Sequence, residues 1–316
     1  MAVSPTPMQL EYVHDNATER SANDTGKFDL SDWMKILSLI LAMVGLVGNS
    51  LVLWLLGFRI PRNPFSVYIL NLAAADALFL CGTFVSIIRY FIDDSYFLLI
   101  DLVLLSLTHM SYTVGLSLLA AISTERCLSV LFPIWYRCNR PRHMSALVCA
   151  LLWAMTCLLW GTGFVICYYI NNDNFCYNFI IIEFSWFSLF TPVLCLSSLA
   201  LLLRVQCTSL RQQPHRLYLL VLLNVLVFLL CGIPMGIMDI ILFWHETIRP
   251  FGILQLLACV NSSANPFIYF FLGKQRHKRR RETLGVILQR ALEDKQDLGA
   301  SGEGHPHTHQ NSEMSS

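Results

Sequence analysis

The residues able to do chemistry in this sequence are polar groups set singly inside long apolar runs. Asp76 stands about midway along one run, and the pair Glu125-Arg126 closes another. A charged group at the centre of a bilayer costs about 2.5–3.5 kcal/mol even on lenient insertion scales. An isolated carboxylate there needs a partner, water or an ion, so these positions predict ion binding and charge pairing rather than catalysis.

Three asparagines, Asn49, Asn261 and Asn265, also lie inside apolar runs and could reach Asp76. We expect them to gather around the carboxylate, because polar side chains in membrane helices pair with one another. The cluster would hold water or a sodium ion. The alternative is a static hydrogen-bond clamp between helices. No other cofactor is indicated, and no group of His, Asp and Glu has the spacing of a metal site.

Prolines interrupt three of the apolar runs. In "NPFIY", Pro266 removes a backbone donor and kinks a helix, and Asn265 could satisfy the groups freed there. Tyr269 follows one turn later. Pro192 and Pro234 predict kinks in two further runs. A kink flanked by polar side chains predicts a hinge.

Candidate ligand contacts lie near the ends of the runs. Asp239 lies five residues beyond Pro234 and is expected to face a cavity, where it would pair with a cationic ligand group or with Arg249 or Arg89. Asp101 and Trp244 are further candidates. His109, within a run, is more typical of a hydrogen-bonded structural residue than of a catalytic one.

Composition explains why such sparse polar groups matter. The chain has 316 residues, of which 55% are hydrophobic and only 14% charged, whereas soluble domains carry about a quarter charged residues. This excess of apolar side chains predicts a membrane protein. The net charge of +1 gives no indication of nucleic-acid binding.

Seven segments have the roughly 20 mainly apolar residues that a membrane-spanning helix needs. The sequence therefore predicts an all-α bundle of seven transmembrane helices. The predicted spans are Ile36–Phe58, Asn63–Ile88, Leu102–Thr124, Met144–Asn172, Asn174–Leu203, Leu217–Trp244 and Pro250–Gly273.

Basic residues follow spans 1, 3, 5 and 7, culminating in "KQRHKRRR" (Lys274–Arg281). Basic loops stay in the cytosol, so the N-terminus is predicted outside and the C-terminus inside. Asn16 and Asn23 begin N-x-Thr sequons in the external tail, where glycosylation is expected. Of the 11 cysteines, only Cys167 and Cys176 fall on the outer side. A loop-closing disulfide between them is feasible, and two free thiols are the alternative.

The chain divides into four parts under this topology. Residues 1–33 form the external tail, 34–273 the bundle, 274–294 a juxtamembrane segment and 295–316 a disordered cytosolic tail. In the third part, the spacing of Leu284, Ile287, Leu288 and Leu292 predicts a short amphipathic helix on the inner leaflet.

Together these markers resemble the rhodopsin-like (class A) G-protein-coupled receptors. Within that class, "YILNLAAAD", "STERCLSVLFPIWYRCNRPRHMSALVCALLW" and "VNSSANPFIYFFLG" are long matches to the Mas-related receptors. The resemblance covers about Val44–Leu292. It implies a plasma-membrane receptor that binds an extracellular peptide or small molecule and activates heterotrimeric G proteins.

The resemblance also assigns roles to residues. Arg126 would be the hub of the G-protein switch, and its pairing with Glu125 at the membrane edge would hold the resting state. The activation switch would comprise Glu125, Arg126, Pro234, Asn265, Pro266 and Tyr269. The usual acid at the foot of span 6 is missing from "RQQPHRL" (Arg211–Leu217), which predicts ligand-free signalling. Hydroxyl residues of the tail would recruit arrestin after phosphorylation.

Several positions depart from the general class pattern. Cys127 replaces the usual Tyr, Gly232 stands where most relatives have Trp, and Asp101 stands where most have the bridging Cys. The last departure supports pairing Cys167 with Cys176. Gly163 and Ile180 replace the acids of members that sense cationic peptides, and Thr108 replaces the Asp of amine receptors. A cationic peptide or a monoamine is therefore disfavoured as the ligand.

Three other functions are weighed against the receptor. A transporter or channel would need more intramembrane ionisable groups and an inverted repeat. A retinal photoreceptor needs a Lys within a span, yet no Lys occurs between Lys35 and Lys274. An enzyme is disfavoured because the chain lacks a Gly-x-Ser-x-Gly motif.

Overall fold

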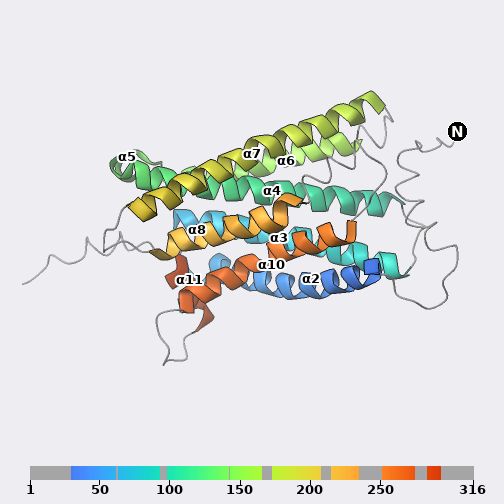
Figure 1. Ribbon diagram of the computed structural model, residues 1–316, viewed down its shortest axis with the longest axis horizontal. Helices are drawn as coiled ribbons and strands as arrows, with labels where there is room; N and C mark the ends of the chain where they lie inside the picture. The colour runs from blue at the N-terminus through green and yellow to red at the C-terminus, as the bar shows by residue number, and fades with distance from the viewer. Residues whose placement is uncertain are drawn as a thin grey trace, which may run out of the picture.

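The computed structural model describes residues 30–61, 63–92, 98–141, 143–165, 173–207, 215–234, 251–274 and 283–292. Every regular element within these ranges is helical. The long helices run side by side along the long axis of the molecule (Figure 1). The elements are α2 (Leu30–Trp54), η1 (Leu55–Arg59), α3 (Pro64–Ile92), α4 (Leu98–Leu131), α5 (Pro133–Asn139), α6 (Met144–Val165), α7 (Asp173–Cys207), α8 (His215–Val227), η3 (Phe228–Gly232), α10 (Phe251–Lys274) and α11 (Leu284–Leu292).

Five of the described helices are long and apolar enough to cross a membrane, and Leu219–Gly232 forms a shorter apolar helix. Their outward surfaces carry large apolar side chains such as Leu151, Leu158, Leu189 and Leu196. So much exposed apolar surface is unfavourable in water but suits a lipid environment. The described helices thus agree with the predicted bundle.

The helices extend beyond the apolar runs that predicted them. Helix α4 has 34 residues, so it is about 51 Å long at 1.5 Å per residue. This exceeds the roughly 30 Å of bilayer hydrocarbon. Backbone hydrogen bonding does not stop at a charged side chain, so α4 continues through Glu125 and Arg126 past the predicted end of the span. We call this end of the bundle, which the predicted topology places in the cytosol, the inner end.

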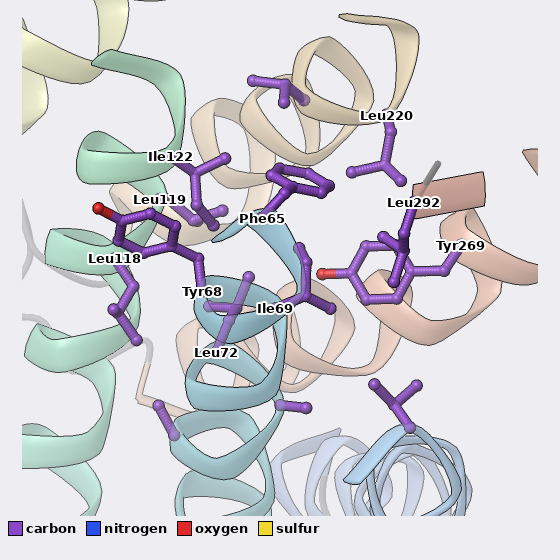
Figure 2. Packing of buried hydrophobic residues seen from close by; sticks show 14 of the residues in the cluster. Phe65, Tyr68, Ile69, Leu72, Leu118, Leu119, Ile122, Leu220, Tyr269 and Leu292 are labelled. Atoms are coloured by element: carbon purple, nitrogen blue, oxygen red, sulfur yellow. The ribbon is translucent and has the colours of Figure 1, made fainter. Parts of the chain in front are cut away.

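The core is built around α3, which packs against α2, α4, α6 and α10, while α4 packs against α3, α6 and α7. Figure 2 shows Phe65 of α3 between Ile122 of α4 and Leu220 of α8, with Tyr269 of α10 pointing its hydroxyl toward α3. All four of these side chains are buried. Their packing joins four helices near the end of the bundle where α5 and α11 lie.

Two of the three predicted proline sites lie inside helices: Pro192 in α7 and Pro266 in α10. Pro234 instead follows the π-helical segment η3, where the backbone N–H of Ile233 donates to the carbonyl of Phe228. A π-segment widens the helix and loosens its register, and such segments often mark functional sites. The irregularity predicted at Pro234 therefore begins one turn before the proline.

Helix α11 occupies only part of the predicted juxtamembrane helix, since residues 275–282 lie outside the described ranges. Ile287, Leu288 and Leu292 are buried, and the side-chain amide of Asn63 donates to the carbonyl of Leu292 at 3.1 Å. The apolar stripe of α11 therefore packs on the bundle.

Candidate functional site

A buried polar cluster joins α3 to α10 in the middle of the bundle. The Asn265 side-chain amide donates to the carboxylate of Asp76 at 2.6 Å, and both residues are buried. The structure thus brings together two residues that the sequence placed near each other. A charge-assisted hydrogen bond of this kind compensates for part of the cost of burying the carboxylate.

Asn49 takes a different place in this region. Its side-chain amide donates to the carbonyls of Gly45 at 3.0 Å and Ser262 at 3.1 Å, so it ties α2 to the backbone of α10. Close packing of these helices continues at Gly48, where a Cβ would lie 3.1 Å from the Pro266 ring. A side chain at Gly48 would require the Pro266 ring to shift by a few tenths of an ångström.

A small cavity adjoins Asp76 and has a volume of about 10 Å³, close to that of one water molecule. Ser111, Asn261, Ser262 and Asn265 are among the residues that line it with Asp76. Carboxylate, hydroxyl and amide oxygens are suitable ligands for a hard cation. Among the described residues, no group of three His, Cys, Asp or Glu side chains could hold a metal ion.

The same cavity borders a contact between α4 and η3. The Tyr112 hydroxyl donates to the carbonyl of Gly232, and the Tyr112 ring centroid lies 6.5 Å from that of Phe228. A Cβ at Gly232 would clash with the Phe228 ring. In this chain, Phe228 therefore occupies the space beside the position where most class members carry Trp.

Tyr269 of "NPFIY" is buried at the inner end of α10, and the side-chain amide of Asn224 on α8 donates to its hydroxyl at 3.5 Å. This long hydrogen bond connects the two helices that carry Pro266 and Pro234. It thus links Tyr269 of the predicted switch to the helix that leads through η3 to Pro234.

Glu125 is the centre of what we call the inner-end network: Glu125, Tyr136, Arg140 and Ser145. The Tyr136 hydroxyl and the Arg140 guanidinium both donate to the Glu125 carboxylate, and Arg140 also donates to Ser145. Burial, and secondly the Glu125 carboxylate, raises the pKa of Tyr136 to about 12. Tyr136 therefore stays protonated and remains a donor at physiological pH.

Arg126, the next residue along α4, contacts α3. Its side chain is packed over the Phe65 ring, with the guanidinium carbon 4.3 Å from the ring centroid, and the residue is only 6% exposed. The Arg126 side chain is therefore almost fully shielded from solvent in this structure. Glu125 reaches Arg140, whereas the Arg126 guanidinium packs over Phe65 of α3; the pairing of Glu125 with Arg126 stays a prediction.

At the opposite end, Asp101 forms an ion pair with Arg89. Arg89 Nε lies 2.8 Å and Nη2 3.3 Å from the two Asp101 carboxylate oxygens, and the Asp101 side chain is 46% exposed. Arg89 thus pairs with one predicted ligand residue. The predicted site residues that lie outside the described part of the chain are Asp239, Trp244, Cys167, Asn16, Asn23 and the side chain of Cys176.

Sequence reasoning missed Tyr112, Tyr136 and Arg140 as members of these sites. Arg140 was read only as a basic loop residue, and Tyr112 carried no signal of its own. The one available hint was Gly232, since a glycine in place of a large aromatic residue leaves space that a neighbouring helix must fill.

Comparison with known proteins defines the class. The family model described as "7 transmembrane receptor (rhodopsin family)" matches residues 48–269, a range that includes Asp76, Arg126 and Tyr269. The relatives include the Mas-related G-protein coupled receptor member X2 of Macaca mulatta, 47% identical over 281 residues (84% of each chain). Member X1 of Homo sapiens is 45% identical over 278 residues, covering 85% of this chain and 86% of the relative.

The chain therefore belongs to the Mas-related branch of the rhodopsin-like G-protein-coupled receptors. It is a seven-transmembrane, multi-pass membrane receptor and not an enzyme, and its partners are a ligand and a G protein. A transporter or channel is not favoured.

Proposed function

We propose that this receptor converts binding of an extracellular peptide or small molecule into exposure of Arg126 at the cytosolic end of the bundle. The observation that carries the proposal is the position of Arg126, a cation buried at the inner end of α4 with its guanidinium over Phe65. A buried cation is costly unless it serves the structure or a switch. In this state the Arg126 side chain packs beside α3, and it becomes exposed to the G protein when the neighbouring helices move apart.

Helix α4 connects the ligand-binding end of the bundle to the end that binds the G protein. It carries Tyr112, which contacts η3, and three to four turns further on it carries Glu125 and Arg126. A ligand that favours one arrangement of α4 against η3 shifts the population of the receptor between two states. Movement of α8 away from α10 would break the Asn224–Tyr269 contact and open the inner end.

The apolar surface around α5 is the proposed docking edge for the G protein. Leu131, Phe132, Ile134 and Trp135 are exposed there, with Ile134 80% exposed. Pro133 begins this short helix, and the Glu125–Arg140 pair fixes the loop that follows it. The network thus positions the docking edge relative to Arg126.

The proposed topology places the N-terminus outside and the C-terminus in the cytosol. We further propose glycosylation at Asn16 and Asn23, a Cys167–Cys176 disulfide, a sodium or water site at Asp76, and arrestin binding to the tail. Oxygen-bearing side chains around the small cavity support the cation site. Asp76→Asn should therefore blunt any sodium dependence of agonist affinity, and unchanged dependence would exclude the ion.

The test is GTP-analogue loading of purified G proteins by the full-length receptor in nanodiscs without ligand. Arg126→Ala should abolish loading above background, and Ile134→Ala should reduce it several-fold. Val47→Ala is the matched control, because Val47 is also apolar and 69% exposed but lies on α2. Loading that survives Arg126→Ala across a panel of Gα subunits would contradict the proposal.

A further inference from the structure

Three aromatic side chains meet between α4, α6 and α7, which lie together in Figure 1. The ring centroids of His109 and Trp160 are 5.4 Å apart, and those of Trp160 and Phe179 are 5.3 Å apart in an edge-to-face arrangement. We call these three residues the outer aromatic cluster. His109 is one helical turn from Tyr112, on the side away from Arg126, so the cluster adjoins the α4–η3 contact.

Trp160 carries an unusual polar group in this cluster. The residue is 9% exposed, and its indole N–H is buried without a hydrogen-bond acceptor among the described residues. Buried Trp N–H groups normally find a partner, and each exception needs an explanation. Trp186 on α7 shows the usual situation, since its indole N–H donates to the Ser117 hydroxyl at 2.9 Å.

Phe179 packs edge-to-face against Trp160. Its ring lies against Gly163, where a Cβ would clash with the ring atoms, so the absence of a side chain at Gly163 lets Phe179 reach Trp160. Phe179 itself is only half-buried. A rotation of this one ring would uncover the indole edge.

The acidic side chains described at this end of the bundle interact with residues outside the cluster. Asp101 pairs with Arg89, and Asp32 accepts a hydrogen bond from Tyr90. The cluster thus offers aromatic surface, the Trp160 indole donor and the polar ring of His109, and its three members contain no carboxylate that would attract a cation.

We propose that the outer aromatic cluster is a ligand subsite for a ring-bearing group attached to a carbonyl or carboxylate oxygen. The ligand ring displaces the edge of Phe179, and its oxygen accepts the hydrogen bond from the Trp160 indole. Since the site lies one turn from Tyr112, a ligand bound there would alter the α4–η3 contact. This subsite deepens the proposed receptor function and rests on it.

The test uses full-length receptor in nanodiscs labelled with 5-fluorotryptophan and observed by ¹⁹F NMR. Three fragments are titrated: 3-phenylpropanamide, 3-phenylpropanoate and 2-phenylethylammonium. The first two share the ring and an oxygen acceptor, and they separate a neutral from an anionic ligand. The third keeps the ring but replaces the acceptor with a cation.

We expect the amide, the carboxylate or both to shift the Trp160 signal, and the ammonium fragment to do so at least tenfold more weakly. Trp160→Phe keeps an aromatic ring but removes the donor, and it should weaken fragment affinity about three- to tenfold. Trp186→Phe is the matched control and should leave affinity unchanged. Phe179→Ala keeps Trp160, removes its cover and should strengthen binding, so it tests the subsite even if Trp160→Phe does not fold.

The proposal is overturned if no fragment moves the Trp160 signal, if the ammonium fragment binds as well as the amide, or if Phe179→Ala weakens binding. Fragment binding is measured without a G protein. Failure here with intact ligand-free GTP-analogue loading would reject the subsite alone, whereas failed loading with fragment binding retained would reject the proposed switch.

Discussion

The two ends of the bundle hold their charges in opposite ways. At the inner end, Glu125 and Arg140 are both nearly buried; Glu125 also accepts a hydrogen bond from Tyr136, and Arg140 also donates one to Ser145. At the outer end, Arg89 pairs with an Asp101 side chain that is 46% exposed. Both pairs lie within hydrogen-bond distance, but they differ in how far their carboxylates are exposed to solvent.

This contrast indicates where the receptor is rigid and where it can adapt. Breaking a buried ion pair by removing one partner costs about 3–5 kcal/mol, because an uncompensated charge is left inside. An exposed pair contributes about 0–1 kcal/mol. The inner end is thus held in a definite arrangement that a G protein can recognise, while the outer end can rearrange around different ligands at little cost.

The largest effect should follow from breaking the inner pair. Arg140→Met leaves the Glu125 carboxylate buried without its cation, so we expect destabilisation by about 3–5 kcal/mol, measured as a lower Tm of the receptor in nanodiscs. Glu125→Gln combined with Arg140→Met should recover most of the loss. A double variant as unstable as Arg140→Met would show that the pair is not the cause.

A smaller effect is expected at Gly232. Gly232→Ala places a Cβ against the Phe228 ring, and overpacking of this kind typically costs about 1–3 kcal/mol. The expected readout is a lower Tm that Phe228→Leu restores in the double variant. Gly57→Ala is the control, because no other atom lies within 4 Å of the Cβ position there. Equal effects at Gly57 and Gly232 would disprove the packing explanation.

Tyr112→Phe removes one hydrogen bond between α4 and η3 but keeps the ring against Phe228. The lost bond is worth about 0.5–1.5 kcal/mol, so ligand-free GTP-analogue loading should rise about three- to tenfold as the resting arrangement weakens. Thr124→Val is a suitable control, since the Thr124 hydroxyl bonds only within α4 in the described structure. Unchanged or reduced loading by Tyr112→Phe would remove this contact from the switch.

The smallest effect should be at the exposed outer pair. Arg89→Ala is expected to change stability by less than about 1 kcal/mol, with the difference disappearing at high salt. Thermal unfolding at low and high salt measures it. A loss as large as that of Arg140→Met would contradict the comparison between the two ends.

Sequence reasoning was strong where local composition decides the outcome. The apolar runs predicted the spans, because a chain in lipid must satisfy its backbone within each helix. The meeting of Asp76 and Asn265 followed from the scarcity of polar groups that could stabilise a buried acid. Helix ends were less predictable, since α4 continues past Glu125 to Leu131.

Tertiary partners were beyond this reasoning. Glu125 stands beside Arg126 in the sequence, yet the structure also brings Arg140, 15 positions away, to the acid. Likewise, the partner of Gly232 is Tyr112, 120 positions away along the chain. Such contacts depend on how the helices are rotated against one another, which the period of apolar residues does not fix. The ligand role of Asp239 and the Cys167–Cys176 disulfide stay predictions.

The π-helical segment η3 continues α8 toward Pro234 and contains one residue more than a regular α-helical turn would. An α-helix turns about 100° per residue, so closing this segment into regular α-helix would rotate everything on its inner side by about that angle. Leu220, now buried in the core, and Asn224, now bonded to Tyr269, would both face new neighbours. A change of hydrogen-bond register over five residues could thus alter the inner surface of the receptor without any helix tilting as a rigid body.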